Sequence, residues 1–188
     1  MQYEYDYEDI DMKIDYRKLS LLMVVAVLML ILIWKTYHQE NTKVLAEVHE
    51  AILDEYGDFY IPSKRIDSDQ MASVFGVTMA YVEEYIGECA MMSTHVDVFI
   101  GIKASRGHSD EIRQQLLVYR DKMIQLYQND PAKLAKITAS DVYDFDEYVF
   151  YMVLGQNSDT VSNDKGDYLT QAARDNQRGE AILVKVFK

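Results

Sequence analysis

Cys89 and His95 are the two residues whose types and spacing come closest to a catalytic pair. They flank residues 90–94, which read as a hairpin connection, so the two side chains could approach each other across it. A thiolate beside an imidazole base is a nucleophile. However, no Asn or Asp is placed to orient the histidine, and a single cysteine on a strand usually packs as a small apolar side chain. The sequence therefore predicts no catalytic residue and leaves a hydrolase that uses Cys89 and His95 as the alternative.

The remaining polar residues form no motif that would hold a metal ion or a cofactor. No two of the four histidines have the H-x-x-x-H or H-E-x-x-H spacing of a zinc site. The acidic clusters at 67–69 and 141–147 lack the D-x-[DN]-x-[DN]-G pattern of a calcium loop. Residues 101–107, GIKASRG, lack the final Gly-Lys-Ser/Thr of a phosphate loop. We therefore predict neither a metal site nor a cofactor.

Length, charge and cysteine content exclude further classes of protein. The chain has 188 residues, a formal net charge of −12 and one cysteine. This length corresponds to about one domain. A negative surface repels polyphosphate, so we predict no nucleic-acid partner. A single cysteine excludes an internal disulfide framework and a zinc site with several thiolates.

The segment Leu19–Trp34, LSLLMVVAVLMLILIW, contains no charged residue. A membrane-spanning helix needs about 17–25 residues, and Tyr16 and Tyr37 extend the segment with aromatic side chains that favour the membrane interface. No small-residue cleavage site follows, which argues against a cleaved signal peptide. We predict a transmembrane signal anchor over residues 19–37, with a buried core helix as the alternative.

The basic residues around this segment predict its orientation. The nearest ones are Lys13, Arg17 and Lys18 before it and Lys35 and Lys43 after it. The positive-inside rule then places the N-terminus in the cytoplasm and the C-terminal domain outside a membrane that is crossed once. Residues 1–18 would form an acidic, Tyr-rich cytoplasmic tail. The reverse orientation, with the domain as a membrane-tethered adaptor facing the cytoplasm, is an alternative.

From residue 41 onward, the hydrophobic pattern predicts an α+β domain over residues 41–155. The expected elements are helices over 41–56 and 109–129 and strands over 81–90, 95–104, 135–142 and 147–154. The order strand, strand, helix, strand, strand indicates a β-β-α-β-β core: a small antiparallel sheet with helices packed on one face.

Alternation along the first two strands assigns side chains to the two faces of this sheet. Over 95–104, apolar residues at every second position are expected to point inward, which leaves Asp97 and Lys103 pointing outward. The strand over 81–90 is expected to separate Val82 and Ile86 from Tyr81, Tyr85 and Cys89.

Residues 156–188 form a C-terminal extension of this domain. Their pattern predicts a polar stretch, then a helix around 168–173 that ends at Gly179. The last eight residues, AILVKVFK, alternate enough for an edge strand, and a short amphipathic helix is the alternative.

Several stretches together carry a resemblance to a known family. The acidic and aromatic strand YVEEYIGECA leads into Met91 and Met92, and VDVFIGIKA, a long helix from near Gly107 and EYVFYMVLG follow. Over residues 44–155 this pattern resembles domain-of-unknown-function family 4358. The resemblance implies a membrane-anchored protein or lipoprotein of Firmicutes, Gram-positive bacteria, that faces outward, and it implies no catalytic residues. This chain differs by its signal anchor, which replaces a lipoprotein cysteine, and by the extension after Gly155.

Tyrosine is unusually frequent, with fifteen residues in the chain. Those in the strands either pack in the core or form a recognition surface, and both interpretations remain open. The candidate interaction surface consists of Tyr81, Tyr85, Met91, Met92 and His95. We expect a membrane-anchored extracytoplasmic binding or protein-interaction module without catalytic activity. Its expected partners are the membrane, through Leu19–Trp34, and an unknown protein or cell-envelope component.

Overall fold

The chain divides into two compact units, Met1–Glu40 and Asn41–Lys188, and helix α1 (Tyr16–Tyr56) contributes to both. The computed structural model describes residues 16–92, 94–156 and 165–187. Most of the predicted cytoplasmic tail therefore lies outside the described residues.

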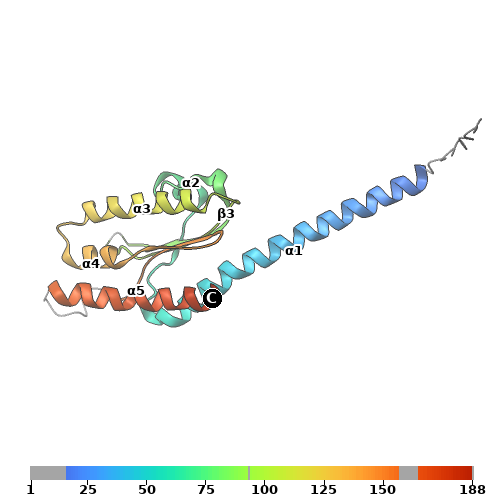
Figure 1. Cartoon of the computed structure of the whole chain (residues 1–188). Coiled ribbons are helices and arrows are strands. Elements are labelled where there is room, and N and C mark those ends of the chain that lie inside the picture. Colours follow the sequence, from blue (N-terminus) through green and yellow to red (C-terminus); the bar gives the residue numbers. More distant parts are fainter. Residues whose placement is uncertain (1–15, 93, 157–164, 188) are drawn as a thin grey trace, which may run out of the picture. The chain divides into compact units, whose positions relative to one another are not determined.

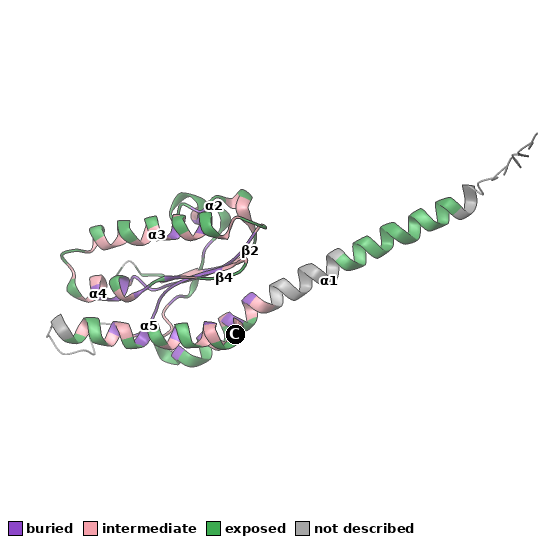
Figure 2. Ribbon diagram, in the orientation of Figure 1, coloured by how far each residue is buried: buried purple, intermediate pink, exposed green. Residues whose placement is uncertain are grey.

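The described side chains of the first unit belong to residues 19–33, and all of them are exposed (Figure 2). The large apolar ones are between 47 % and 67 % exposed. Within the described part of the chain, no helix combines the length and the apolarity that a membrane crossing requires.

The second unit contains a five-stranded antiparallel sheet with the strand order β1-β2-β3-β5-β4. The strands are β1 (Lys64–Arg65), β2 (Val82–Cys89), β3 (Val98–Ala104), β4 (Val142–Phe145) and β5 (Tyr148–Val153). This arrangement confirms the predicted α+β class and the antiparallel sheet.

Helices cover both faces of the sheet (Figure 1). The first face packs against α2 (Ser68–Ser73), the short helix η2 (Met79–Tyr81) and α3 (Ser109–Leu126). The second face packs against the last part of α1 and against α5 (Lys165–Phe187). The short helix η1 (Gly57–Phe59) follows α1.

The prediction that helices pack on one face is therefore wrong. β3 and β5 carry apolar side chains on both faces, and Phe99 and Phe150 on the second face are fully buried. The second helical layer also changes the surroundings of Asp97 and Lys103. Both were expected to point outward, yet they are only 2 % and 1 % exposed.

Two acidic side chains lie close to the ammonium group of the buried Lys103. Its Nζ lies 2.6 Å from an oxygen of Glu83 and 3.8 Å from one of Glu147.

The register between β2 and β3 shifts between Val82 and Glu84, as in a bulge, which turns Val82 toward the first face. The expected grouping of Val82 with Ile86 is wrong for this reason.

The strand predicted over 135–142 is instead helix α4 (Pro131–Ala139), followed by β4. Two local signals favour a helix here, although the segment contains β-branched residues that favour a strand. Pro131 occupies the first turn, where its missing N–H has no intrahelical partner. The carboxylate of Asp130 accepts the N–H of Lys133 at 3.2 Å as an N-cap.

The C-terminal extension is one continuous helix from Lys165 to Phe187, so neither the stop at Gly179 nor the edge strand is correct. The polar stretch predicted before this helix lies mostly outside the described residues. Gly179 instead permits a close approach to α1. The Tyr56 hydroxyl accepts the Gly179 N–H at 3.1 Å and donates to the carbonyl of Asp175. A Cβ at Gly179 would lie 3.0 Å from that hydroxyl oxygen. The ion pair of Arg178 with Glu55, at 2.8 Å, adds a surface link between α5 and α1.

A buried ion pair joins Asp97, the residue before β3, to α4. The ammonium of Lys136 lies 2.6 Å from Oδ1 of Asp97 and donates to the carbonyl of Gly155 at 3.1 Å. The other carboxylate oxygen, Oδ2, has no hydrogen-bond partner among the described residues. Burial raises the pKa of Asp97, although the adjacent Lys136 favours the charged form.

Removal of one partner of this pair leaves a buried charge without compensation. We expect Lys136→Met to lower the free energy of unfolding by about 3–5 kcal/mol, and the double change Asp97→Leu with Lys136→Met to restore most of it. Urea unfolding of the full chain in detergent micelles measures both. Lys133→Met, which removes a partly exposed pair with Asp130, is the control and should cost about 0–1 kcal/mol. Equal losses in the two single variants would contradict this account.

Candidate functional site

The edge of β2 is open over most of its length because β1 is very short. β1 pairs Lys64 with Cys89 and Arg65 with Glu88. The N–H of Ile66 then donates to the carbonyl of Gly87 at 2.8 Å. Immediately afterward, Asp67 caps α2 by accepting the N–H of Gln70 at 2.8 Å. This cap turns the chain away, so the described chain provides no further strand along this edge.

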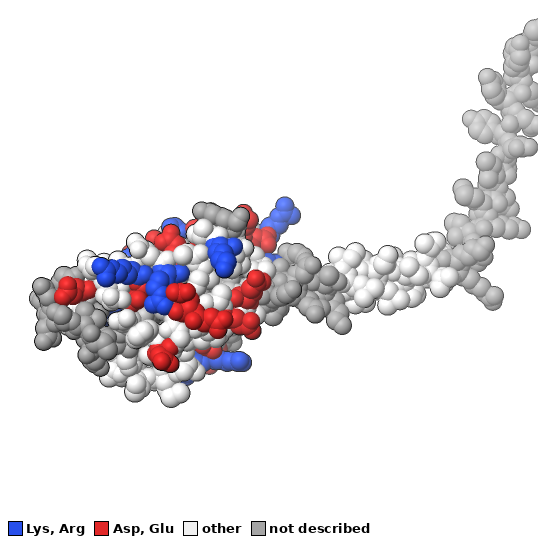
Figure 3. All heavy atoms as spheres, turned by 90° about the horizontal axis from the view of Figure 1, so that it is seen from below, with Lys and Arg blue, Asp and Glu red and all other residues white. Residues whose placement is uncertain are grey.

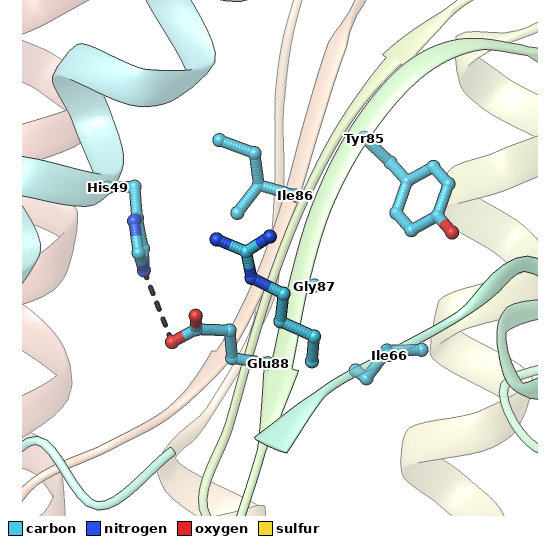
Figure 4. A pocket seen from close by; sticks show the side chains of 7 residues that line it. His49, Ile66, Tyr85, Ile86, Gly87 and Glu88 are labelled. Carbon is cyan, nitrogen blue, oxygen red and sulfur yellow. Dashed lines mark ion pairs between the residues drawn. The ribbon is translucent and has the colours of Figure 1, made fainter. Parts of the chain in front are cut away.

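A pocket of about 340 Å³ lies at this edge (Figure 4). Its lining residues are His49, Arg65, Ile66, Tyr85, Ile86, Gly87 and Glu88. Tyr85 packs toward the first face of the sheet and Ile86 toward the second. Figure 4 shows them on opposite sides of β2. Because residues of both faces line the pocket, it is located at the strand edge.

A hydrogen-bonded network of three side chains borders the pocket. The Tyr60 hydroxyl donates to Oε2 of Glu88 at 3.1 Å, and Nε2 of His49 lies 3.0 Å from that hydroxyl. The same His49 nitrogen is 3.4 Å from the Glu88 carboxylate. Burial, reinforced by the negative charge of Glu88, raises the pKa of Tyr60 far above its ordinary value. The tyrosine therefore keeps its proton, and we assign the Nε2–H of His49 as the donor to its oxygen.

Arg65 differs from these residues because its charge is not compensated within the described chain. Its side chain is exposed and lines the pocket. No described residue forms an ion pair or a hydrogen bond with its guanidinium, whereas Glu88 already accepts from Tyr60. The pocket therefore offers one available cation next to a carboxylate that already accepts a hydrogen bond.

The structure places Cys89 and His95, the two residues of the hydrolase alternative, in different surroundings. No hydrogen bond joins them among the described residues, and the His95 N–H donates to the carbonyl of Met92 at 3.1 Å in a turn. Cys89 packs against the core of the first face. Burial raises the pKa of its thiol, and the opposing effect of Lys64 is smaller. A raised pKa disfavours the thiolate that a nucleophile requires.

The five residues of the predicted interaction surface have different surroundings. Tyr81 stacks on His108 with ring centroids 4.1 Å apart, and Tyr85 lines the pocket. Met91 and Met92 follow β2 and are 73 % and 60 % exposed. His95 is half-buried.

Sequence reasoning missed four residues of the site: His49, Tyr60, Arg65 and Glu88. No motif links them, because α1, a loop, β1 and β2 each contribute one. The described residues also include no group of three or more His, Cys, Asp or Glu side chains that could hold a metal ion.

The fold and this pocket define a small α+β domain with a candidate binding site at the edge of an antiparallel sheet. The family model described as Domain of unknown function (DUF4358) matches residues 55–154. The chain belongs to this family, which confirms the resemblance noted from the sequence. The match includes Tyr60, Arg65 and Glu88, whereas His49 precedes it. No curated protein and no solved structure matches the chain.

The raised pKa of Cys89 predicts slow alkylation. At pH 8 we expect the thiol of the native chain to react with iodoacetamide several-fold more slowly than the thiol of the urea-unfolded chain, because less of it is thiolate. Cys89 is the only cysteine, so mass spectrometry of the intact chain follows this reaction directly. A native rate equal to or above the unfolded rate would instead favour the hydrolase alternative.

Proposed function

We propose that this chain is a membrane-anchored binding module without catalytic activity. Residues 19–37 would cross the membrane once, and the α+β domain would bind its partner outside the cytoplasm. The pocket at the β2 edge carries the binding part of this proposal. It combines Arg65, a cation without an ion-pair partner among the described residues, with a hydrogen-bonded acidic group, Glu88, and an apolar side chain, Ile86. Ligand-binding pockets share this combination of apolar lining and a few convergent polar groups.

The exposed apolar surface of α1 supports the anchor. Figure 3 shows the described stretch over 19–33 without a single charged side chain. A helix that is hydrophobic on all sides is normally buried in protein or membrane. The excess of basic residues before this stretch favours a cytoplasmic N-terminus.

The anchor predicts how charged substitutions redistribute the chain. Val25→Lys combined with Leu28→Lys should move it from the carbonate-washed membrane pellet to the soluble fraction, since each lysine near the helix centre costs about 2.5–3.5 kcal/mol of insertion free energy. The matched control, Val25→Ile with Leu28→Ile, should stay in the pellet. If the doubly charged variant pellets as fully as the control, residues 19–37 are not the anchor.

Orientation is measured by labelling single cysteines in intact cells. In a Cys89→Ala background, Gln177→Cys on the exposed surface of α5 should react with a membrane-impermeant maleimide without permeabilisation. Gln2→Cys in the N-terminal tail is the matched control and should react only after permeabilisation. The reverse pattern would establish the cytoplasm-facing adaptor in place of this proposal.

Binding at the pocket is tested by photo-crosslinking in cells. A benzophenone amino acid at Tyr85 should give a discrete crosslinked product that mass spectrometry identifies. The same amino acid at Leu126, which is 66 % exposed on α3, should not give that product. Equal yields at both positions, or no product at Tyr85, would contradict a binding role for this pocket.

A further inference from the structure

The backbone of β2 presents unpaired hydrogen-bonding groups beside the pocket. In an antiparallel pair, backbone groups alternate between the two neighbours of a strand. The bond from Ile66 N–H to Gly87 C=O shows that Gly87 faces the β1 side. The N–H and C=O of Tyr85, two residues earlier, therefore face the same side, where β1 has already ended.

No described residue forms a backbone hydrogen bond with Tyr85 on that side. The pocket of about 340 Å³ occupies the adjoining space, and its lining includes every β2 residue from Tyr85 to Glu88. An unpaired strand edge is a template on which another extended chain can add main-chain hydrogen bonds.

The far end of β2 limits the length of this template. The bulge between Val82 and Glu84 interrupts the register there, and Glu83 is held by Lys103 at 2.6 Å. Bulges and charged side chains of this kind restrict edge-to-edge association. The usable edge is therefore short and runs from about Tyr85 to Gly87.

The charges at this edge favour an acidic peptide over a second copy of the chain. Two copies that paired edge to edge about Ile86 would place Glu84 of one opposite Glu88 of the other, and like charges in opposed positions are destabilising. Arg65, in contrast, has no partner among the described residues and stands next to the open edge. A guanidinium binds a carboxylate strongly, through two parallel hydrogen bonds.

The geometry points to an extended peptide segment as the partner of this site. It adds a short strand to the edge of β2 through the N–H and C=O of Tyr85, and it places a carboxylate on Arg65. The carboxylate belongs either to an Asp or Glu side chain or to the C-terminus of the peptide. This inference rests on the proposed binding role of the pocket and names the class of partner.

Hydrogen exchange of the full chain in lipid nanodiscs tests the open edge without a ligand. The amide of Tyr85 should exchange rapidly, whereas the amides of Ile86 and Glu88, which face β3, should be protected. Protection of Tyr85 equal to that of Ile86 would show that the edge is already covered, and would overturn the inference.

Selection from a displayed library of random octapeptides, against the same nanodiscs, tests the partner. Enriched peptides should contain an acidic residue or end in a free carboxylate. Amidated synthetic copies separate these two sources, since amidation abolishes binding only where the terminal carboxylate meets Arg65. Failure to enrich any peptide, or enrichment of peptides without a carboxylate, would overturn the inference.

Two variants connect the selected peptides to the two contacts. Tyr85→Pro removes only one outward N–H from the backbone, which an edge strand tolerates, and should weaken binding by about tenfold or more. Its matched control, Tyr85→Ala, loses the same side chain but retains that N–H, so it should bind the peptide several-fold more tightly than Tyr85→Pro. Arg65→Gln should weaken the binding of an acidic peptide about tenfold. It should not change the binding of a synthetic peptide in which Gln replaces the acidic residue.

Near-UV circular dichroism verifies that each variant is folded. Because Arg65 is exposed, Arg65→Gln tests the inference even if Tyr85→Pro fails to fold. Equal binding by Tyr85→Pro and Tyr85→Ala, with no effect of Arg65→Gln, would overturn the inference. Specific crosslinking at Tyr85 in cells alongside a failed peptide selection would reject the peptide partner and leave the binding module intact. If neither a crosslink at Tyr85 nor an enriched peptide is found, the proposed function itself is rejected.

Discussion

Burial of β3 on both faces is the constraint on which the rest of the second unit depends. Every residue from Val98 to Ala104 is buried. A strand with two apolar faces needs a layer on each, and here helices supply both. The same burial brings the charges of Asp97 and Lys103 into the interior. Each is paired there because an isolated charge at these positions would be very costly.

The open edge follows from the neighbours of this central strand. β2 is held firmly by β3 on one side, while β1 covers only its last two residues on the other. The pocket therefore rests on a rigid strand, and the network of His49, Tyr60 and Glu88 ties that strand to α1. These three side chains are therefore held in position before a ligand arrives, whereas Arg65 is exposed.

Elements were predicted correctly where the local preference of their residues agrees with the layers against which they pack. The strand over 95–104 and the helix over 109–129 were recognised because their periodicities match the layers that they contact. The strand predicted over residues 135–142 is wrong because Asp130 and Pro131, which lie outside that window, start a helix. Asp97 was assigned to the surface because alternation cannot reveal a second layer of helices.

The site was largely beyond the reach of sequence reasoning. Tyr85 belongs to the candidate interaction surface predicted from the sequence, and it lines the pocket. The partners of Glu88 come from an α-helix and a loop far away along the chain, so only the fold brings them together. Arg65 carries no local signal either, because its importance comes from the early end of β1 and not from a motif.

Helices α1 and α5 cover the second face of the sheet, and both lie almost entirely outside the segment that the family model matches. The matched span, residues 55–154, omits Leu45, Val48 and Leu183, which cover the second face of the sheet. That span expressed by itself would leave Phe99 and Phe150 facing water. It is therefore not a self-sufficient folding unit in this chain. Any relative built on the same sheet needs its own flanking helices, or another apolar surface, to replace the missing layer.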